Sequence, residues 1–165
     1  MHCTAQMISV LAAKVALGRR LELKRSMPIR HNDLQFELPA GWVDATQVVI
    51  VGPEADGFQA NVVVSREPLL ASETLASFAK GQADDLTETI ASYTLVREGP
   101  ATFGAVTGFS REFKGSLDGQ KYQFIQFYSM GHNEVFVLTV TQADGKLEAI
   151  RPAIEKLFAS WQVNR

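Results

Sequence analysis

The chain has 165 residues, of which 46% are hydrophobic and 21% are charged, a composition typical of one soluble globular domain. Its single cysteine, Cys3, excludes a disulfide framework within the chain and any zinc site built from several cysteines. The formal net charge of −2 excludes the strongly basic surface with which proteins bind nucleic acid.

The charge divides the chain into two unequal parts. Residues 1–26 carry five basic residues and one acidic residue, whereas residues 27–165 carry 11 basic and 17 acidic residues. This change predicts a boundary near Met27, with a basic N-terminal extension before it and a single domain after it. Two interpretations of the extension remain open: it is a frayed, disordered tail, or it lies upstream of a true start at Met27.

The extension contains one apolar run, Met7–Leu17 (MISVLAAKVAL). This run is too short to cross a bilayer, and it includes Lys14. A secretory signal has its positive charges before the apolar run, but here Arg19 and Arg20 follow it. We therefore expect no stable membrane insertion, and a membrane-surface or targeting role is the minor alternative for this segment.

Three strands are predicted in the first part of the domain. Residues 34–38 alternate apolar and polar side chains, which predicts a strand that ends at Pro39. Residues 46–51 (TQVVIV) are rich in β-branched side chains, and residues 58–67 (FQANVVVSRE) form a third strand. The turn residues at 52–57 (GPEADG) join the second and third strands into a hairpin.

A long helix is predicted next. Ser72 is a suitable N-cap, and apolar residues recur at helical spacing as far as about Ala91. The residues of this helical face are Leu75, Phe78, Gln82, Leu86 and Ile90. Residues 93–98 then form a short strand that Gly99 and Pro100 terminate.

Further strands and a second helix complete the domain. The remaining extended segments are residues 103–114, 121–130 and 134–142. An Asp118-Gly119 turn separates the first two of them, and a C-terminal helix begins near Leu147, with Pro152 in its first turn or at a kink. The order of elements predicts an α+β fold: a twisted, mainly antiparallel sheet of six or seven strands, a long helix after strand three and a C-terminal helix.

Several predicted strands are apolar on both faces. Side chains alternate between faces along a strand, so Val62 and Val64 share one row of the strand 58–67. The opposite row of that strand consists of Asn61, Val63 and Ser65. On strand 121–130, an aromatic row consists of Tyr122, Phe124, Gln126 and Tyr128. An antiparallel sheet with one wet face should alternate cleanly, so the second face must meet a helix, a subunit or a ligand.

Two interpretations of this second face compete. Either the aromatic row packs under the long helix as ordinary core, or the face is a groove, open to water in the unbound protein, that accepts an apolar partner. Gln82 and Gln126 interrupt the apolar rows, and a buried amide without a partner costs about 1–3 kcal/mol. Each glutamine is either satisfied internally or available to a partner. With Asn61 and Ser65, they indicate an apolar surface dotted with hydrogen-bonding groups.

The sequence shows no constellation of catalytic or metal-binding residues. His2, His31 and His132 are its only histidines, and none has the spacing of a metal-binding motif. There is no nucleophile elbow and no phosphate-binding loop. Arg111 and Glu112 are interpreted as charges at a strand edge. We therefore expect no enzyme activity, no metal and no cofactor.

Five short motifs carry a resemblance to a known family. They are residues 36–44 (FELPAGWVD), 61–67 (NVVVSRE), 73–75 (ETL), 122–123 (YQ) and 151–152 (RP). Their order and spacing, over residues 28–163, resemble the DcrB-like superfamily, whose fold is related to PsbP and Mog1 proteins. Within that superfamily, the chain is most similar to the Eag chaperones of bacterial type VI secretion.

The resemblance implies a chaperone function. Eag chaperones are cytoplasmic, non-enzymatic homodimers that bind the N-terminal transmembrane helices of an effector, often an Rhs toxin with a PAAR domain. They shield these helices until the effector is loaded onto the VgrG spike. The binding face of the family, a concave sheet face beside the long helix, corresponds here to Val48, Ile50, Asn61, Val63, Ser65, Gln82, Leu86, Ile90, Tyr122 and Gln126.

Two other functions fit the same pattern of residues. A small-ligand, lipid-binding or regulatory module on this fold predicts an enclosed pocket rather than an open groove. A structural dimer predicts that the apolar sheet face is simply the interface between subunits.

Overall fold

The computed structural model describes residues 28–31, 34–37, 39 and 44–162. The predicted extension 1–26 and most of the predicted break after residue 38 lie outside the described residues. The elements are, in chain order, β1 (Pro28–His31), β2 (Leu34–Glu37), β3 (Val48–Ala55), β4 (Phe58–Pro68), α2 (Leu75–Thr89), β5 (Ala91–Phe103), β6 (Val106–Leu117), β7 (Gln120–Met130), β8 (Glu134–Ala143) and α3 (Leu147–Ala159).

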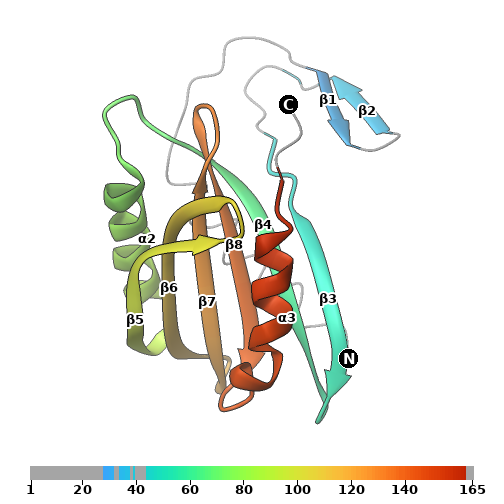
Figure 1. The fold of residues 1–165 in the computed structure, drawn as a ribbon, viewed down its shortest axis with the longest axis vertical. Coiled ribbons are helices and arrows are strands. Elements are labelled where there is room, and N and C mark those ends of the chain that lie inside the picture. The colour runs from blue at the N-terminus through green and yellow to red at the C-terminus, as the bar shows by residue number, and fades with distance from the viewer. Residues whose placement is uncertain (1–27, 32–33, 38, 40–43, 163–165) are drawn as a thin grey trace.

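Six strands form one antiparallel sheet in the order β3-β4-β8-β7-β6-β5 (Figure 1). After the β3–β4 hairpin, the chain crosses through α2 to the far edge and returns through β5, β6 and β7, so that β8 pairs with β4. β1 and β2 form a separate two-stranded hairpin. The predicted α+β fold is confirmed; α2 follows the second strand of the six-stranded sheet, and α3 is the C-terminal helix.

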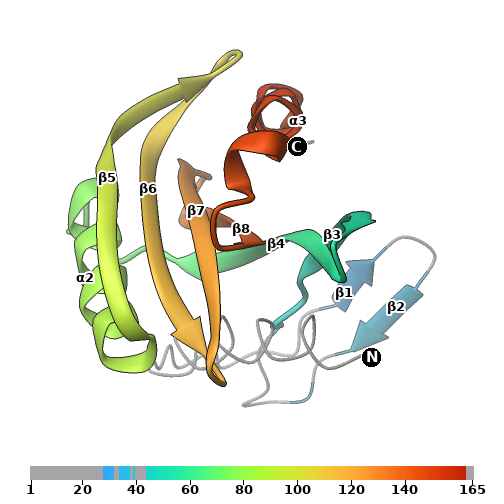
Figure 2. The ribbon, with the colours of Figure 1, turned by 90° about the horizontal axis from the view of Figure 1, so that it is seen from below.

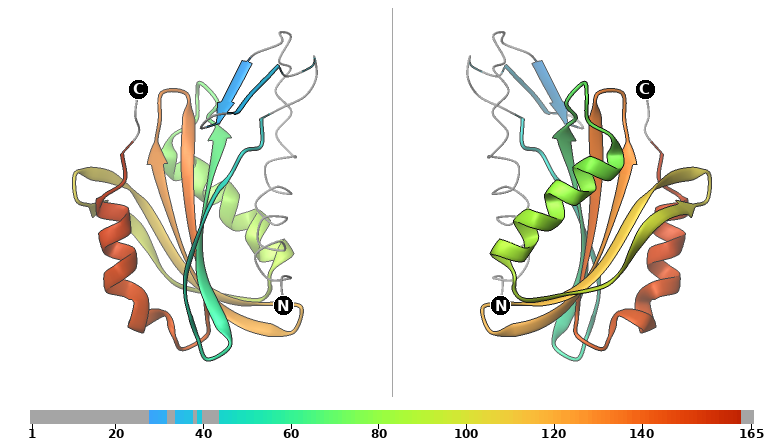
Figure 3. Two further views of the ribbon diagram at one scale, coloured as in Figure 1. Left: turned by 90° about the vertical axis from the view of Figure 1, so that its right-hand side faces the viewer. Right: turned by 90° about the vertical axis from the view of Figure 1, so that its left-hand side faces the viewer.

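The two helices lie on opposite faces of the sheet (Figures 2 and 3). We call these the α3 face and the α2 face. The core on the α3 face consists of Val62, Val64, Ile125, Phe127, Phe136, Leu138 and Val140 beneath Leu147, Ile154 and Phe158. On the α2 face, Phe78, Ala79, Leu86 and Ile90 of the helix region pack on Phe113, Tyr122, Phe124, Tyr128, Val135 and Val137. The strands are apolar on both sides because each face packs against a helix.

Asp-Gly pairs form two of the tight hairpin turns. The φ angles are 53° and 76° at Asp56 and Gly57, and 48° and 78° at Asp118 and Gly119. A two-residue turn with positive φ at both central positions matches the right-handed twist of the flanking strands, and Asp-Gly adopts it readily. Both predicted hairpins are therefore confirmed at their turns.

The long helix begins two residues later than predicted. Thr74 is the N-cap: its hydroxyl accepts a hydrogen bond from Ser77 N (3.2 Å), and Ser77 Oγ accepts one from Thr74 N (2.9 Å). This reciprocal capping box satisfies two amide groups that the first turn leaves without helical partners. Ser72 lies instead in a turn closed by a hydrogen bond from Glu73 N to Leu70 O.

One prediction about proline was wrong, and one of two alternatives for another is excluded. β5 does not end at Gly99 and Pro100 but continues to Phe103, with Pro100 paired to Phe109. The position tolerates proline because β5 is the edge strand, where a missing N–H on the outer side costs no ladder bond. Pro152 lies inside α3 beyond its first turn, which excludes the first-turn alternative; the carbonyl of Glu148 therefore lacks its usual helical N–H partner.

Candidate functional site

One half of the α2 face is core beneath α2. The helix contacts β5, β6 and β7, and its Phe78 and Ala79 also pack on Val135 and Val137 of β8. Three of the predicted binding residues, Leu86, Ile90 and Tyr122, lie together in one apolar cluster there. Nearby, Tyr128 packs against Phe78 of the helix with ring centroids 6.1 Å apart. For this half of the face the core interpretation of the aromatic row is the right one.

The rest of the α2 face lies over β4 and the residues of β8 beyond Val137. We call Asn61, Val63 and Ser65 the β4 row. Ser65 pairs with Val137, which packs against Phe78 of α2, and this pairing fixes the row on the α2 face. The exposed fractions of Asn61, Val63 and Ser65 are 4%, 2% and 7%. The expectation that this row is open to water in the unbound protein is therefore wrong.

The pairing of β3 with β4 corrects the predicted site at two residues. Val48 pairs with Val64 and Ile50 with Val62, so Val48 and Ile50 lie on the α3 face, away from the β4 row. The β3 residues that do adjoin the row are Val49, which pairs with Val63, and Val51, which pairs with Asn61. Four apolar residues in succession carry no alternation, so the sequence could not show which two face which side.

Two buried polar atoms on this part of the face have no hydrogen bond. Asn61 Oδ1 and Thr141 Oγ1 are both fully enclosed and find no partner among the described residues. They are close neighbours, because Asn61 on β4 pairs directly with Thr141 on β8. Each such group costs about 1–3 kcal/mol relative to a satisfied one. The pair marks a place where a polar partner would be stabilising.

Gln126 lies on the same face but is satisfied within the protein. Its Oε1 accepts a hydrogen bond from the hydroxyl of Tyr128 (2.5 Å), and its Nε2 donates to Thr139 Oγ1 (3.3 Å). Burial raises the pKa of Tyr128 well above its usual range, so this hydroxyl remains a donor. Gln82, the other predicted glutamine, is buried on α2. Of the two open interpretations of Gln126, the internal one is correct.

Arg111 connects this network to α2, and the prediction that it is a charge at a strand edge is wrong. Arg111 is only 2% exposed, and its Nη1 donates to the carbonyl oxygen of Ala79 in α2 (2.7 Å) and to Tyr128 Oη (3.1 Å). Its Nε donates to Glu98 on β5 (2.9 Å). The signal that was missed is alternation: Arg111 stands between Phe109 and Phe113 in an inward-facing row. Arg111 therefore fastens α2 to the sheet.

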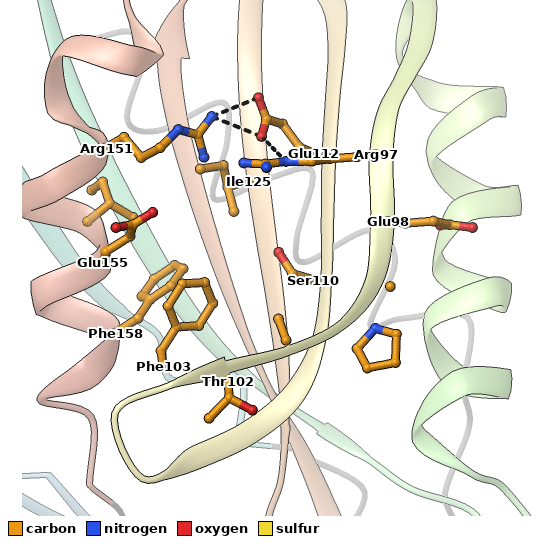
Figure 4. Close-up of a pocket in the computed structure, with 14 residues that line it drawn as sticks. Arg97, Glu98, Thr102, Phe103, Ser110, Glu112, Ile125, Arg151, Glu155 and Phe158 are labelled. Carbon is orange, nitrogen blue, oxygen red and sulfur yellow. Dashed lines mark hydrogen bonds and ion pairs between the residues drawn. The ribbon is translucent and has the colours of Figure 1, made fainter.

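A cavity of about 330 Å³ lies on the α3 face between β5, β6 and α3 (Figure 4). Glu112 is buried in its wall and accepts hydrogen bonds from Arg97 (2.9 Å) and Arg151 (3.0 Å). Arg151 also pairs with Glu148, whose carboxylate raises the pKa of the guanidinium. The apolar end of the cavity is lined by Phe103, Ile125 and Phe158. Glu112, Arg97 and Arg151 therefore bind one another, and the bond between Glu112 on β6 and Arg151 on α3 holds the helix on the sheet.

The described part of the chain offers no other candidate chemistry. None of its histidine, aspartate and glutamate side chains gather in threes that could hold a metal ion. Neither α2 nor α3, the helices of that part, is long and apolar enough to span a lipid bilayer.

Several solved structures share this fold. Protein PA94 of Pseudomonas aeruginosa, a protein of unknown function described as a putative regulator, superposes with a TM-score of 0.71 at 15% identity, over 85% of this chain and 98% of that chain. Cyanobacterial PsbP (CyanoP) from Synechocystis sp. PCC 6803 gives a TM-score of 0.47 at 8% identity, over 84% of this chain and 91% of that chain. The Ran-binding protein Mog1p of Saccharomyces cerevisiae gives 0.48 at 14% identity, over 83% and 87%. No curated protein sequence matches the chain.

The similarity to PA94 extends over most of both chains, but at 15% identity it shows the shared fold alone. The sequence itself carries the family assignment. The model of the DcrB family matches residues 33–160, which is more than half of the chain. The chain therefore belongs to the DcrB family.

Proposed function

We propose that this chain is a cytoplasmic, homodimeric chaperone for a type VI secretion effector of the Rhs/PAAR type. It binds and shields the effector's N-terminal transmembrane helices and aids loading onto the VgrG spike. Membership of the DcrB family fits a binding or regulatory module. The observation that carries the finer proposal is the pair of buried, unpartnered polar atoms, Asn61 Oδ1 and Thr141 Oγ1, on the apolar strip beside α2.

We call the β4 row together with Val49 and Val51 of β3 the apolar strip. Its apolar side chains are suited to cover a transmembrane helix. Val63 lies at its centre, and Val49 and Val51 extend it along β3 with exposed apolar side chains. Covering such a surface stabilises the complex by roughly 25 cal/mol for each Å² of apolar area removed from water. An unshielded transmembrane helix would otherwise aggregate through the same kind of surface.

The polar atoms add selectivity for a particular kind of helix. Asn61 Oδ1 can accept a hydrogen bond from a serine or threonine hydroxyl of the partner, and Thr141 Oγ1 can donate one. Helices that pack in membranes are rich in small and hydroxyl-bearing residues, which bond across closely spaced backbones. The strip therefore suits a helix rich in small residues better than one built from leucine alone.

The substitution Thr141→Val tests the proposal because it separates stability from binding. It removes a buried hydroxyl without a partner while keeping the side-chain shape, so we expect unfolding of the unbound protein to become about 1 kcal/mol harder. The same change removes a hydrogen bond to the partner, so affinity for a co-expressed effector N-terminal fragment should fall about fivefold. Urea unfolding and quantitative pull-down measure the two effects.

The matched control is Thr107→Val, which changes an exposed threonine on the β6 side of the far hairpin. It should alter neither stability nor binding. If Thr141→Val stabilises the protein and leaves affinity for the fragment unchanged, Thr141 is ordinary core and the proposal loses its main support.

A small-ligand or lipid-binding module is the second candidate, favoured by the cavity on the α3 face. The mutual pairing of Glu112 with Arg97 and Arg151 leaves these side chains little to offer a ligand. A bound small molecule detected by native mass spectrometry, and lost in Ser110→Phe within the cavity wall, would favour this candidate over the chaperone.

A further inference from the structure

We infer that two copies of this chain pair along the outer edge of β3 and form one continuous antiparallel sheet. In this pairing Ile50 lies opposite Ile50 of the partner subunit, and Val49 lies opposite Val51 of the partner subunit. The pairing itself rests on the properties of the sheet edge. Its use in shielding an effector rests in addition on the proposed function, which includes a homodimer without assigning its interface.

The outer edge of β3 carries an apolar run without charges. Among the described strands β3 pairs only with β4, so the backbone groups of its other edge are available to a further strand (Figure 1). Residues 48–51 pair with β4 in unbroken register, and their side chains are 40–51% exposed, two on each face. No charged residue occurs from residue 45 to residue 53. A regular, exposed and apolar edge of this kind is a template for strand pairing.

The opposite edge of the sheet, β5, is protected against such pairing. The register of β5 with β6 is irregular in two places, one of them between Leu95 and Arg97. Arg97 and Glu98 bring charges into the middle of the strand, and Pro100 has no N–H to donate. Proteins block association between edges with bulges, charges and proline. Because β5 has all three devices and residues 48–51 of β3 have none, β3 is the edge that is suited to pair.

The apolar run of β3 is complementary to a second copy of itself. A two-fold axis perpendicular to the sheet brings identical edges together as antiparallel neighbours and keeps equivalent faces on the same side. With the axis at Ile50, the β-branched residues 49 and 51 of the two copies meet on the α2 face. β-Branched cross-strand pairs stabilise a sheet, whereas like charges directly opposite each other destabilise it. The ladder over residues 47–53 contains no charge, so nothing in it repels the second copy.

Edge pairing leaves the α2 face open and widens it. Val49 and Val51 keep their side chains on that face, so the apolar strips of the two copies become neighbours on one side of the joined sheet. The two β4 rows are then three strand spacings apart, about 14 Å. An effector helix therefore meets one apolar surface to which both copies contribute, instead of two separate strips.

Charge complementation at position 50 tests the pairing without any effector. The parent chain should sediment as a dimer in analytical ultracentrifugation. Ile50→Lys and Ile50→Glu each place like charges opposite each other at the two-fold axis, so each should weaken the dimer about tenfold or more. An equal mixture of the two variants should restore the dimer, because opposite charges then face each other. Mixing would not restore variants that had merely lost their fold.

The matched control is Leu95→Lys, because Leu95 is similarly exposed but lies on the β5 edge. This variant should leave the dimer unchanged. A monomeric parent, a dimer that Ile50→Lys leaves intact, or a mixture without recovery would overturn the inference. A dimer that survives Ile50→Lys would still agree with the proposed function, which fails separately if Thr141→Val leaves the affinity for the effector fragment unchanged.

Disulfide formation provides a second measurement in case the charged variants fail to fold. The background is Cys3→Ser, which leaves no other thiol. Opposite residues of antiparallel strands have Cα atoms about 4.5–5.5 Å apart, within reach of a disulfide, so oxidised Ile50→Cys should form a covalent dimer. In the same ladder the two copies of residue 48 are four residues apart along the strand, about 13 Å, so Val48→Cys should not crosslink. Equal crosslinking at positions 48 and 50 would overturn the inference.

Discussion

Replacing Arg111 with methionine tests how α2 is held on the sheet. The guanidinium is buried between the helix and β6 and makes hydrogen bonds to Ala79 O, Tyr128 Oη and Glu98. Methionine has a similar length and fills the same space, so Arg111→Met removes the polar connections while retaining most of the apolar contact.

The expected loss follows from the exposure of each partner. Hydrogen bonds to a charged group contribute about 1.5–3 kcal/mol each, and two of them, to Ala79 O and Tyr128 Oη, are buried. Glu98 is 40% exposed, so water takes over its solvation and the ion pair adds little. Apolar burial by methionine recovers part of the loss. We expect a net destabilisation of about 3 kcal/mol, or a melting temperature about 6–12 °C lower for a chain of this size.

Urea unfolding of Arg111→Met beside Glu98→Ala measures these contributions. Glu98→Ala should cost less than 1 kcal/mol, because only the exposed partner is lost. A loss below 1 kcal/mol in Arg111→Met would refute the assignment of Arg111 as the fastening of α2. So would a loss in Glu98→Ala as large as that in Arg111→Met.

Three further predictions follow from burial and geometry. Because burial raises the pKa of Tyr128, its contribution to stability is complete below about pH 10, where unfolded tyrosine titrates, and is lost at higher pH. The free energy of unfolding in urea should therefore fall less between about pH 8 and 10.5 in Tyr128→Phe than in the parent, and an equal fall would contradict the burial of Tyr128. Val62→Asp should prevent folding because Val62 lies in the apolar core beneath α3, whereas Val48→Asp, at an exposed position on the same face, should fold with little loss by circular dichroism; equal damage would contradict the core placement of Val62. Gly108→Ala should lower stability by about 1–3 kcal/mol in thermal unfolding, because the added Cβ would lie 2.1 Å from the carbonyl oxygen of Tyr128, and an unchanged melting temperature would count against the close approach of β6 and β7 there.

The fold was predictable because its signals are local. Asp-Gly turns, runs of β-branched residues and two stretches of helical spacing establish the order of strands and helices. The boundaries that failed depend on the surroundings. Thr74 became the N-cap because Ser77 could complete a capping box, and Pro100 stayed within a strand because β5 is at the edge of the sheet.

The candidate site was only partly predictable. The row of Asn61, Val63 and Ser65 was identified by alternation and lies together on the α2 face. Val48 and Ile50 were assigned to the wrong face. Residues 48–51 are all apolar, so only their pairing with β4 determines which of their side chains point to which face of the sheet. The role of Arg111 and the unpartnered state of Thr141 depend on contacts between strands distant in sequence, which no single-strand pattern contains.

Site-specific photo-crosslinking tests most directly whether a partner's helix binds along the β4 row. A benzophenone amino acid is placed at Val49 or Val51, which are exposed beside the row, or at Val48 or Ile50, which are equally exposed on the opposite face of the same strand. With a co-expressed effector N-terminal fragment, positions 49 and 51 should crosslink to its transmembrane segment, and positions 48 and 50 should not. Crosslinks from both faces alike, or from positions 48 and 50 alone, would contradict the account.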